Sequence, residues 1–391
     1  MLALAYQRFG RIATFPAMLH LSPEFSRPKP NGFSSYAWKR LLVSLLVGCS
    51  LTGTWALGTL KSASAQSLPI LPPPSLDTPN QFGDRPPSYT ETEANRLFRL
   101  GQDAKAAGQT TRAIGLWRGA LEQYQLIFDL PAMGAVYNHL GFAYLELGDY
   151  RAAEDALRRS LAVASDLNDY SQQVYGYNNI GTLLLNNNNP QAAADAFRSA
   201  VRVARSIGDE PGEGLSLSNL GLAIATQGDP TQALEIYRQA WLLRRRYPER
   251  GGQASTLNNI GDAYAALKQY DQAVGEYRLA RWYAHDNGDL PNEFRALGQL
   301  ALNYGLSGRW PQAFATLEDW VLLAREHQNL RQELRALHIY AQYYGFLGRW
   351  ENSYKLYSNA IAVAEQLGDR EGVEILHSEQ AQIVHQFPFP R

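Results

Sequence analysis

The sequence contains a single cysteine, Cys49, among its 391 residues. A disulfide within one chain and a zinc site made of several cysteines are therefore both excluded. The seven histidines show no metal-ligand spacing, so we expect no metal and no cofactor. The HExxH, phosphate-loop and GxSxG patterns are also missing. We therefore predict no catalytic residues and disfavour an enzyme.

Charge is sparse as well, since charged residues make up 19% of the chain and the formal net charge is -1. The chain has 36 basic and 37 acidic side chains. Residues 1–65 carry seven of the basic and one of the acidic side chains, which leaves 29 basic and 36 acidic side chains in residues 66–391. A body with this acidic balance lacks the basic surface that nucleic acid requires. The hydrophobic fraction of 45% nevertheless predicts a folded core.

The first part of the chain has the features of an export signal. Residues 1–38 have no periodic pattern, and we interpret them as a disordered extension or an over-long start. Residues 39–65 begin with two basic residues, continue with an uncharged run over 41–60, and end on Ala63–Ala65, an A-x-A cleavage site. The run of 20 residues is also long enough to span a bilayer.

Three interpretations of this segment stay open. The chain is cleaved after Ala65, retains the segment as an anchor, or is lipidated at Cys49, where residues 46–49 resemble a bacterial lipobox. All three predict a periplasmic, lumenal or extracellular protein, which touches a membrane only through this segment if the segment is uncleaved or lipidated. Residues 66–89 are proline-rich and are predicted to be a semi-rigid linker.

From residue 90 to residue 370 the sequence repeats every 40 residues. A column of small residues comprises Gly101, Gly141, Gly181, Gly221, Gly261, Ala301, Ala341 and Ala381. A column of bulky residues comprises Trp117, Leu157, Phe197, Tyr237, Tyr277, Leu317 and Tyr357. The constant register predicts seven helix–turn–helix repeats, followed by a capping helix over 371–386 and a tail over 387–391.

The turns carry their own signals. Glycine or asparagine recurs between the two helices of a repeat, as at Gly148 and Asn188, and both tolerate the left-handed backbone that ends a helix. Asp149 and Asn189 follow as helix caps. Pro190 then occupies a first helical position, where the missing N–H costs nothing.

The pattern resembles the tetratricopeptide repeat family. One unit matches the family's order with Tyr137, Leu140, Gly141, Tyr144, Ala153, Leu157 and Ser160. The repeat of 40 residues exceeds the usual length and is similar to that of kinesin light chain and the bacterial quorum-peptide receptors. The resemblance implies an all-α fold, a right-handed superhelical solenoid of stacked antiparallel helix pairs that binds protein or peptide partners in a concave groove.

Asparagines recur just before the small residue of the first helix, and their direction can be predicted. A helix turns about 100° per residue, so the columns of Asn138 and His139 face away from the second helix of the same repeat. We therefore expect these amides to line the groove, where they offer donors and acceptors to an extended peptide. The candidate groove residues are Tyr175, Asn178, Asn179, Leu215, Asn219, Leu222, Asn258, Asn259, Asp262, Arg295 and Arg335.

Within this set, Tyr175, Leu215 and Leu222 are predicted to contact the side chains of the peptide, and Arg295 and Arg335 to bind a carboxylate. An alternative is that the amides of neighbouring repeats bond to one another and hold the stack together. At the level of function, a partner-binding scaffold competes with a passive spacer tethered to a membrane. The sequence leaves the identity of the partner and the oligomeric state open.

Overall fold

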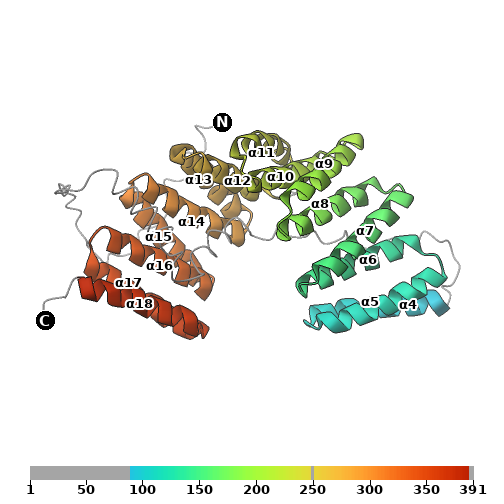
Figure 1. Ribbon diagram of the computed structural model, residues 1–391, viewed down its shortest axis with the longest axis horizontal. Helices are drawn as coiled ribbons and strands as arrows, with labels where there is room; N and C mark the ends of the chain where they lie inside the picture. Colours follow the sequence, from blue (N-terminus) through green and yellow to red (C-terminus); the bar gives the residue numbers. More distant parts are fainter. Residues whose placement is uncertain (1–88, 248–250, 387–391) are drawn as a thin grey trace. The chain divides into compact units, whose positions relative to one another are not determined.

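The computed structural model describes residues 89–247 and 251–386, which form fifteen α-helices and no strand (Figure 1). The first helices of the pairs are α4 (Tyr89–Ala106), α6 (Leu130–Glu146), α8 (Tyr170–Asn186), α10 (Glu210–Thr226), α12 (Gln253–Ala266), α14 (Leu290–Leu306) and α16 (Leu330–Phe346). The second helices are α5 (Thr110–Leu126), α7 (Tyr150–Asp166), α9 (Pro190–Ser206), α11 (Pro230–Arg244), α13 (Tyr270–Asp286), α15 (Trp310–Glu326) and α17 (Trp350–Leu367). The cap is α18 (Arg370–Gln386).

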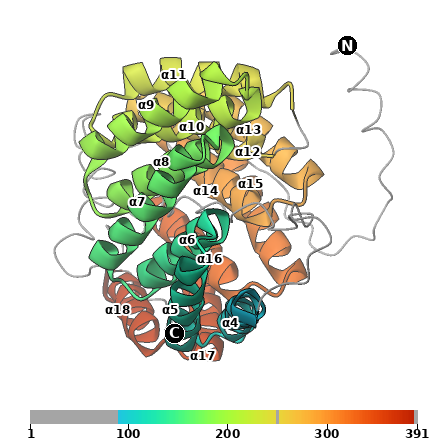
Figure 2. The same ribbon diagram turned by 90° about the vertical axis from the view of Figure 1, so that its right-hand side faces the viewer.

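Each first helix packs against the second helix that follows it, and each second helix packs against the next first helix. First helices of adjacent repeats also touch, as α8 does with α10 and α12 with α14. In Figure 2, α9, α11 and α13 lie above α8, α10 and α12, so the two kinds of helix form two layers. The predicted all-α fold of stacked antiparallel helix pairs is confirmed.

The turns follow the sequence signals. The predicted turn column adopts positive φ at Gly108, Gly148, Asn188, Gly228, Lys268, Gly308 and Gly348. In three of the seven repeats the side chain of the next residue, Asp149, Asn189 or Asp229, caps the second helix. Asp149, for example, accepts a hydrogen bond from the backbone N–H of Ala152 at 3.0 Å. From α5 onward the helix starts keep the 40-residue register except at α12, which begins at Gln253, after two glycines with positive φ.

The column of small residues allows the two helices of a repeat to approach each other. A Cβ atom on Gly181 would lie 2.5 Å from the ring of Phe197, and one on Gly221 would lie 2.6 Å from Tyr237. Phe197 and Tyr237 are fully buried in the largest hydrophobic cluster. Glycine therefore provides the space that a bulky side chain of the second helix fills.

Replacing Gly181 with alanine is expected to destabilise the protein by up to about 2 kcal/mol. Overpacking against Phe197 costs about 1–3 kcal/mol, of which the better helix propensity of alanine recovers about 1 kcal/mol. Urea denaturation followed by circular dichroism measures the difference.

The matched control is Gly275→Ala, since Gly275 lies in α13 with no atom within 4 Å of its added Cβ. This variant should be more stable than the wild type by up to about 1 kcal/mol. Adding Phe197→Leu to Gly181→Ala reproduces the native pair of Ala301 and Leu317, both buried. Additive effects of the two substitutions would contradict direct contact between these positions.

No helix within residues 89–247 and 251–386 is long and apolar enough to cross a membrane. The predicted export segment over 39–65 and Cys49 lie outside the described residues. Of the predicted linker over 66–89, the structure describes only Tyr89, which begins α4.

Candidate functional site

The recurring asparagines lie between first helices. Asn178 of α8 is 1% exposed; its Nδ2 donates to the backbone oxygen of Val174 at 2.9 Å and to Oγ of Ser216 at 2.8 Å. Asn219 of α10 donates from Nδ2 to Oδ1 of Asn178 at 2.9 Å. These bonds link α8 directly to α10.

The same holds further along the stack. Asn258 of α12 is fully buried, and its Nδ2 donates to the backbone oxygen of Asn292 on α14 at 3.2 Å. Oδ1 of Asn259 accepts a hydrogen bond from Nη2 of Arg295 at 2.8 Å. Asn179 is buried as well. First helices α12 and α14 are therefore joined through amides, as α8 and α10 are.

The prediction that Asn178, Asn179, Asn219, Asn258 and Asn259 are open to a groove is wrong, since all five are buried. A helical wheel places them away from the second helix of their own repeat. The first helix of an adjacent repeat, which a wheel does not include, covers them. The alternative interpretation, in which amides of neighbouring repeats bond to one another, is confirmed for Asn178 and Asn219.

A buried ion pair ties α12 to α14. The side chain of Arg295 is 10% exposed, and its Nη2 donates to Oδ2 of Asp262 at 2.5 Å. The hydroxyl of Tyr277 donates to the other oxygen, Oδ1, at 2.6 Å. Burial by itself lowers the pKa of Arg295, but the adjacent Asp262 outweighs it, so this pKa is raised.

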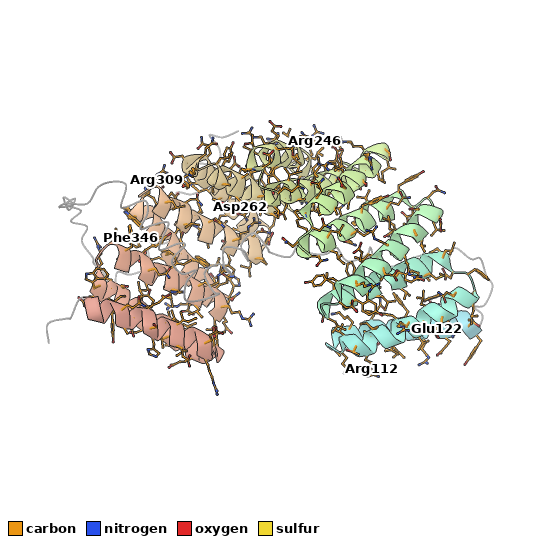
Figure 3. The ribbon with its side chains drawn as sticks, in the orientation of Figure 1. Arg112, Glu122, Arg246, Asp262, Arg309 and Phe346 are labelled. Carbon is orange, nitrogen blue, oxygen red and sulfur yellow. The ribbon has the colours of Figure 1, made fainter. Side chains whose placement is uncertain are left out.

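This pair corrects the role predicted for Arg295. We expected its guanidinium to bind a carboxylate of a ligand, but it already binds Asp262 of its own chain. Asp262 lies on α12 in Figure 3 and keeps a third of its side chain exposed. Of the two predicted arginines, only Arg335 of α16 is exposed, and no carboxylate of the described residues pairs with it.

The apolar candidates are half-buried. Tyr175 of α8 and Leu215 and Leu222 of α10 each keep part of their side chain accessible. Together with Asp262 and Arg335, they are the predicted groove residues that a partner can reach. The accessible face of the first helices thus carries aromatic and aliphatic groups with a few charges, and the amides lie beneath it.

Two polar atoms in this region have no hydrogen-bond partner among the described residues. Oδ1 of Asn258 is a buried acceptor, and Nε of Arg295 is a buried donor. Such orphaned groups are uncommon in folded proteins, where nearly every buried polar atom is paired. Asn258 lies on α12 and Arg295 on α14.

Replacing Asn178 with alanine is expected to destabilise the protein by about 1–3 kcal/mol, because Asn219 then has a buried amide without its acceptor. Urea denaturation measures the change. Asn186→Ala is the matched control, since Asn186 ends the same helix and is exposed. Equal effects of the two substitutions would show that the buried network contributes nothing particular.

Sequence reasoning missed the partners of these amides. Ser216 bonds to Asn178 across 38 positions, and Ser218 pairs with Thr256 across the same interval at 3.3 Å. Asn219 and Asn178 differ by 41 positions. The sequence signal for these contacts is a pair of polar residues separated by 38 or 41 positions, which is two fewer or one more than the 40-residue repeat. The stagger of adjacent first helices sets these separations.

Comparison with known families agrees with this geometry. The family model described as tetratricopeptide repeat matches residues 93–166, 133–206, 170–240 and 212–281. Residues 93–281 are therefore similar to tetratricopeptide repeats. A model described as anaphase-promoting complex subunit 5 matches residues 292–338 and 333–386, which continue the array. No curated protein matches the chain.

Solved structures share the tetratricopeptide repeat fold at low identity. A signal transduction ATPase with numerous domains and a tetratricopeptide repeat sensor, from Pyrococcus horikoshii, is 18% identical, with a TM-score of 0.58 over 73% of this chain and 44% of that one. Aspartyl phosphate phosphatase F from Bacillus subtilis is 13% identical, with a TM-score of 0.54 over 70% of each chain. The apo form of RapI is 13% identical, with a TM-score of 0.52 over 71% of this chain and 99% of that one. The chain spans less than half of the ATPase, and these similarities concern the fold alone.

Proposed function

We propose that the protein is an exported, non-catalytic scaffold whose first helices bind an extended segment of a partner protein. Tetratricopeptide repeats provide extended surfaces for protein partners, which supports a protein or peptide ligand. The observation that carries the proposal is the accessible face of the first helices, where Tyr175, Leu215 and Leu222 lie together with the charged Asp262 and Arg335.

The accessible residues suggest how such a segment is held. Asp262 can accept a hydrogen bond or a positive charge from the partner, while Arg335 offers an exposed guanidinium for a carboxylate. Tyr175, Leu215 and Leu222 lie earlier along the stack and offer apolar contacts. The buried amides hold the first helices in register, so the binding residues are positioned before the partner arrives.

A peptide selection tests this proposal. The full chain is panned against a random peptide library, and binding of an enriched peptide is measured by fluorescence anisotropy. We expect Arg335→Ala and Tyr175→Ala to weaken binding about tenfold, because a few contacts carry most of the affinity of an interface. Arg112→Ala is the control, since Arg112 is exposed on the second helix α5 (Figure 3).

Two results would count against the scaffold. One is a selection that enriches no peptide. The other is a peptide whose affinity falls as much in the Arg112 variant as in the Arg335 variant.

A passive spacer is the second candidate, and the buried amides favour it because they serve the stack itself. Deleting residues 170–209, which contain α8 and α9, would leave a spacer functional but shorter. The same deletion would abolish peptide binding by a scaffold, because Tyr175 is removed and the register of the accessible residues is broken.

Export is the other part of the proposal. The basic start, the apolar run and the A-x-A site over 39–65 support it. Mass spectrometry of the chain from its native host distinguishes a start at Gln66, a retained segment and a lipid on Cys49. An unmodified chain that begins at Met1 and is found in the cytoplasm would overturn export.

A further inference from the structure

The second helices carry an exposed apolar row in the middle of the array. Leu242 of α11 is 53% exposed, Trp282 of α13 is 49% exposed and Leu322 of α15 is 64% exposed. The three residues are 40 positions apart and occupy the same place in their helices. Repeats on either side place Arg202 and Ala362 at this position, so the row is confined to three consecutive second helices.

The three helices form a continuous surface. The rings of Trp241 and Tyr283 join α11 to α13, with their centroids 5.4 Å apart. Nη1 of Arg281 and Oδ2 of Asp319 join α13 to α15 at 2.8 Å. Leu279, one turn before Trp282, is also exposed and widens the row at its centre. Exposed apolar residues that gather in this way mark an interaction site.

Charge is distributed unequally along the row. The exposed side chains Arg238, Arg245 and Arg246 lie on α11 or just beyond its end. Glu318, Asp319 and Glu326 lie on α15, also exposed. Arg238 and Glu318 occupy equivalent positions of their helices, as do Arg246 and Glu326. The row therefore has a basic end, an apolar centre and an acidic end.

We propose that this row is the interface of a homodimer in which α11 of each chain faces α15 of the other. The two-fold axis runs parallel to α13 and passes beside Trp282. It places α11 of the second copy opposite α15 of the first, and it leaves each residue at the same height along the helix axis. It therefore places Arg238 and Arg246 opposite Glu318 and Glu326 of the second copy. The apolar row is then buried against itself, as a self-complementary two-fold interface requires.

The charges favour a second copy over a membrane. Together with the two arginines that follow it, α11 carries four basic side chains and one acidic side chain. Helix α13 carries two basic and three acidic side chains, and α15 carries one basic and three acidic side chains. An anionic lipid surface attracts a face with a basic excess, and this face has none. A self-complementary partner needs both signs at opposite ends, which is what the face provides.

Sedimentation velocity on the full chain tests the proposal. We expect a concentration-dependent dimer, and Leu322→Glu and Trp282→Glu should each raise its dissociation constant at least about tenfold. Phe128→Glu is the control, because Phe128 is exposed outside the row and should leave the dimer unchanged. Circular dichroism of each variant verifies that the helices are retained.

Charge reversal tests the arrangement itself. The variant Arg238→Glu with Arg246→Glu has two acidic ends, and the variant Glu318→Arg with Glu326→Arg has two basic ends. Each alone should dimerise at least about tenfold more weakly, while an equimolar mixture should form the heterodimer. Weaker dimerisation of each variant alone, together with recovery in the mixture, is the result expected if α11 faces α15.

Three outcomes would overturn the proposal. The first is a wild-type chain that stays monomeric at every concentration tested. The second is a dimer that withstands both glutamate substitutions. The third is a monomeric wild type that binds vesicles of phosphatidylcholine with one quarter phosphatidylserine and loses this binding in Leu322→Glu, which would assign the row to a membrane.

Discussion

Replacing Asp262 with alanine is expected to lower the free energy of unfolding by about 3–5 kcal/mol, the largest effect among these substitutions. The cost arises because Arg295 keeps its positive charge in a site that water hardly reaches. Its Nη2 then retains only Oδ1 of Asn259 as an acceptor. The hydroxyl of Tyr277, which donates to Asp262 at 2.6 Å, also loses its partner in a buried position.

Chemical denaturation of Asp262→Ala against the wild type measures this loss. A matched control is Asp319→Ala, which removes an exposed ion pair with Arg281 and should cost no more than about 1 kcal/mol. The double variant Asp262→Ala with Arg295→Met removes both charges and should recover much of the stability. Similar losses in the Asp262 and Asp319 variants would mean that the pair is not effectively buried.

Acidification is expected to destabilise the protein through His139, by about 3 kcal/mol between pH 6.5 and pH 4. The imidazole lies beside Trp117, with ring centroids 5.0 Å apart, and against the edge of Phe98 at 5.2 Å. Burial lowers the pKa of His139 from 6.5 to about 4. The unfolded chain therefore binds a proton in this range that the folded chain excludes.

The sign follows from this difference in proton binding. Above pH 6.5 the histidine is neutral in both states and its protonation has no effect on stability. As the pH falls toward 4, protonation favours the unfolded chain, and below about 4 the loss is complete. Urea denaturation at several pH values measures it.

The control variant is His139→Asn, because asparagine occupies the equivalent position at Asn179, Asn219 and Asn259. This variant removes the titrating group, so the part of the pH dependence that belongs to His139 should vanish. Carboxylates that titrate below pH 5 affect both proteins equally and cancel in the comparison. Identical pH profiles would show that His139 is accessible to protons in the folded state.

Much of the fold was predictable because its determinants are local. The turn at Asn188 needs a residue that tolerates positive φ, and Gly181 must face Phe197 only 16 positions later. These requirements recur with every repeat, so a constant spacing of 40 residues reveals them. The type of residue at each position of the 40-residue repeat was therefore enough to predict the helices, the turns and the close packing of the two helices within a repeat.

The sequence by itself determined the repeat, the turns and the pairing of helices within each unit, because these depend on contacts fewer than 40 residues apart. Only the tertiary structure decided which polar residues are covered, since the stagger of adjacent first helices selects offsets of 38 and 41 positions. In the tertiary structure Asn178 is buried, Arg295 forms an ion pair with Asp262, and Trp282 is exposed. A helical wheel describes one helix and its partner, whereas burial in a stack depends on the neighbour that follows.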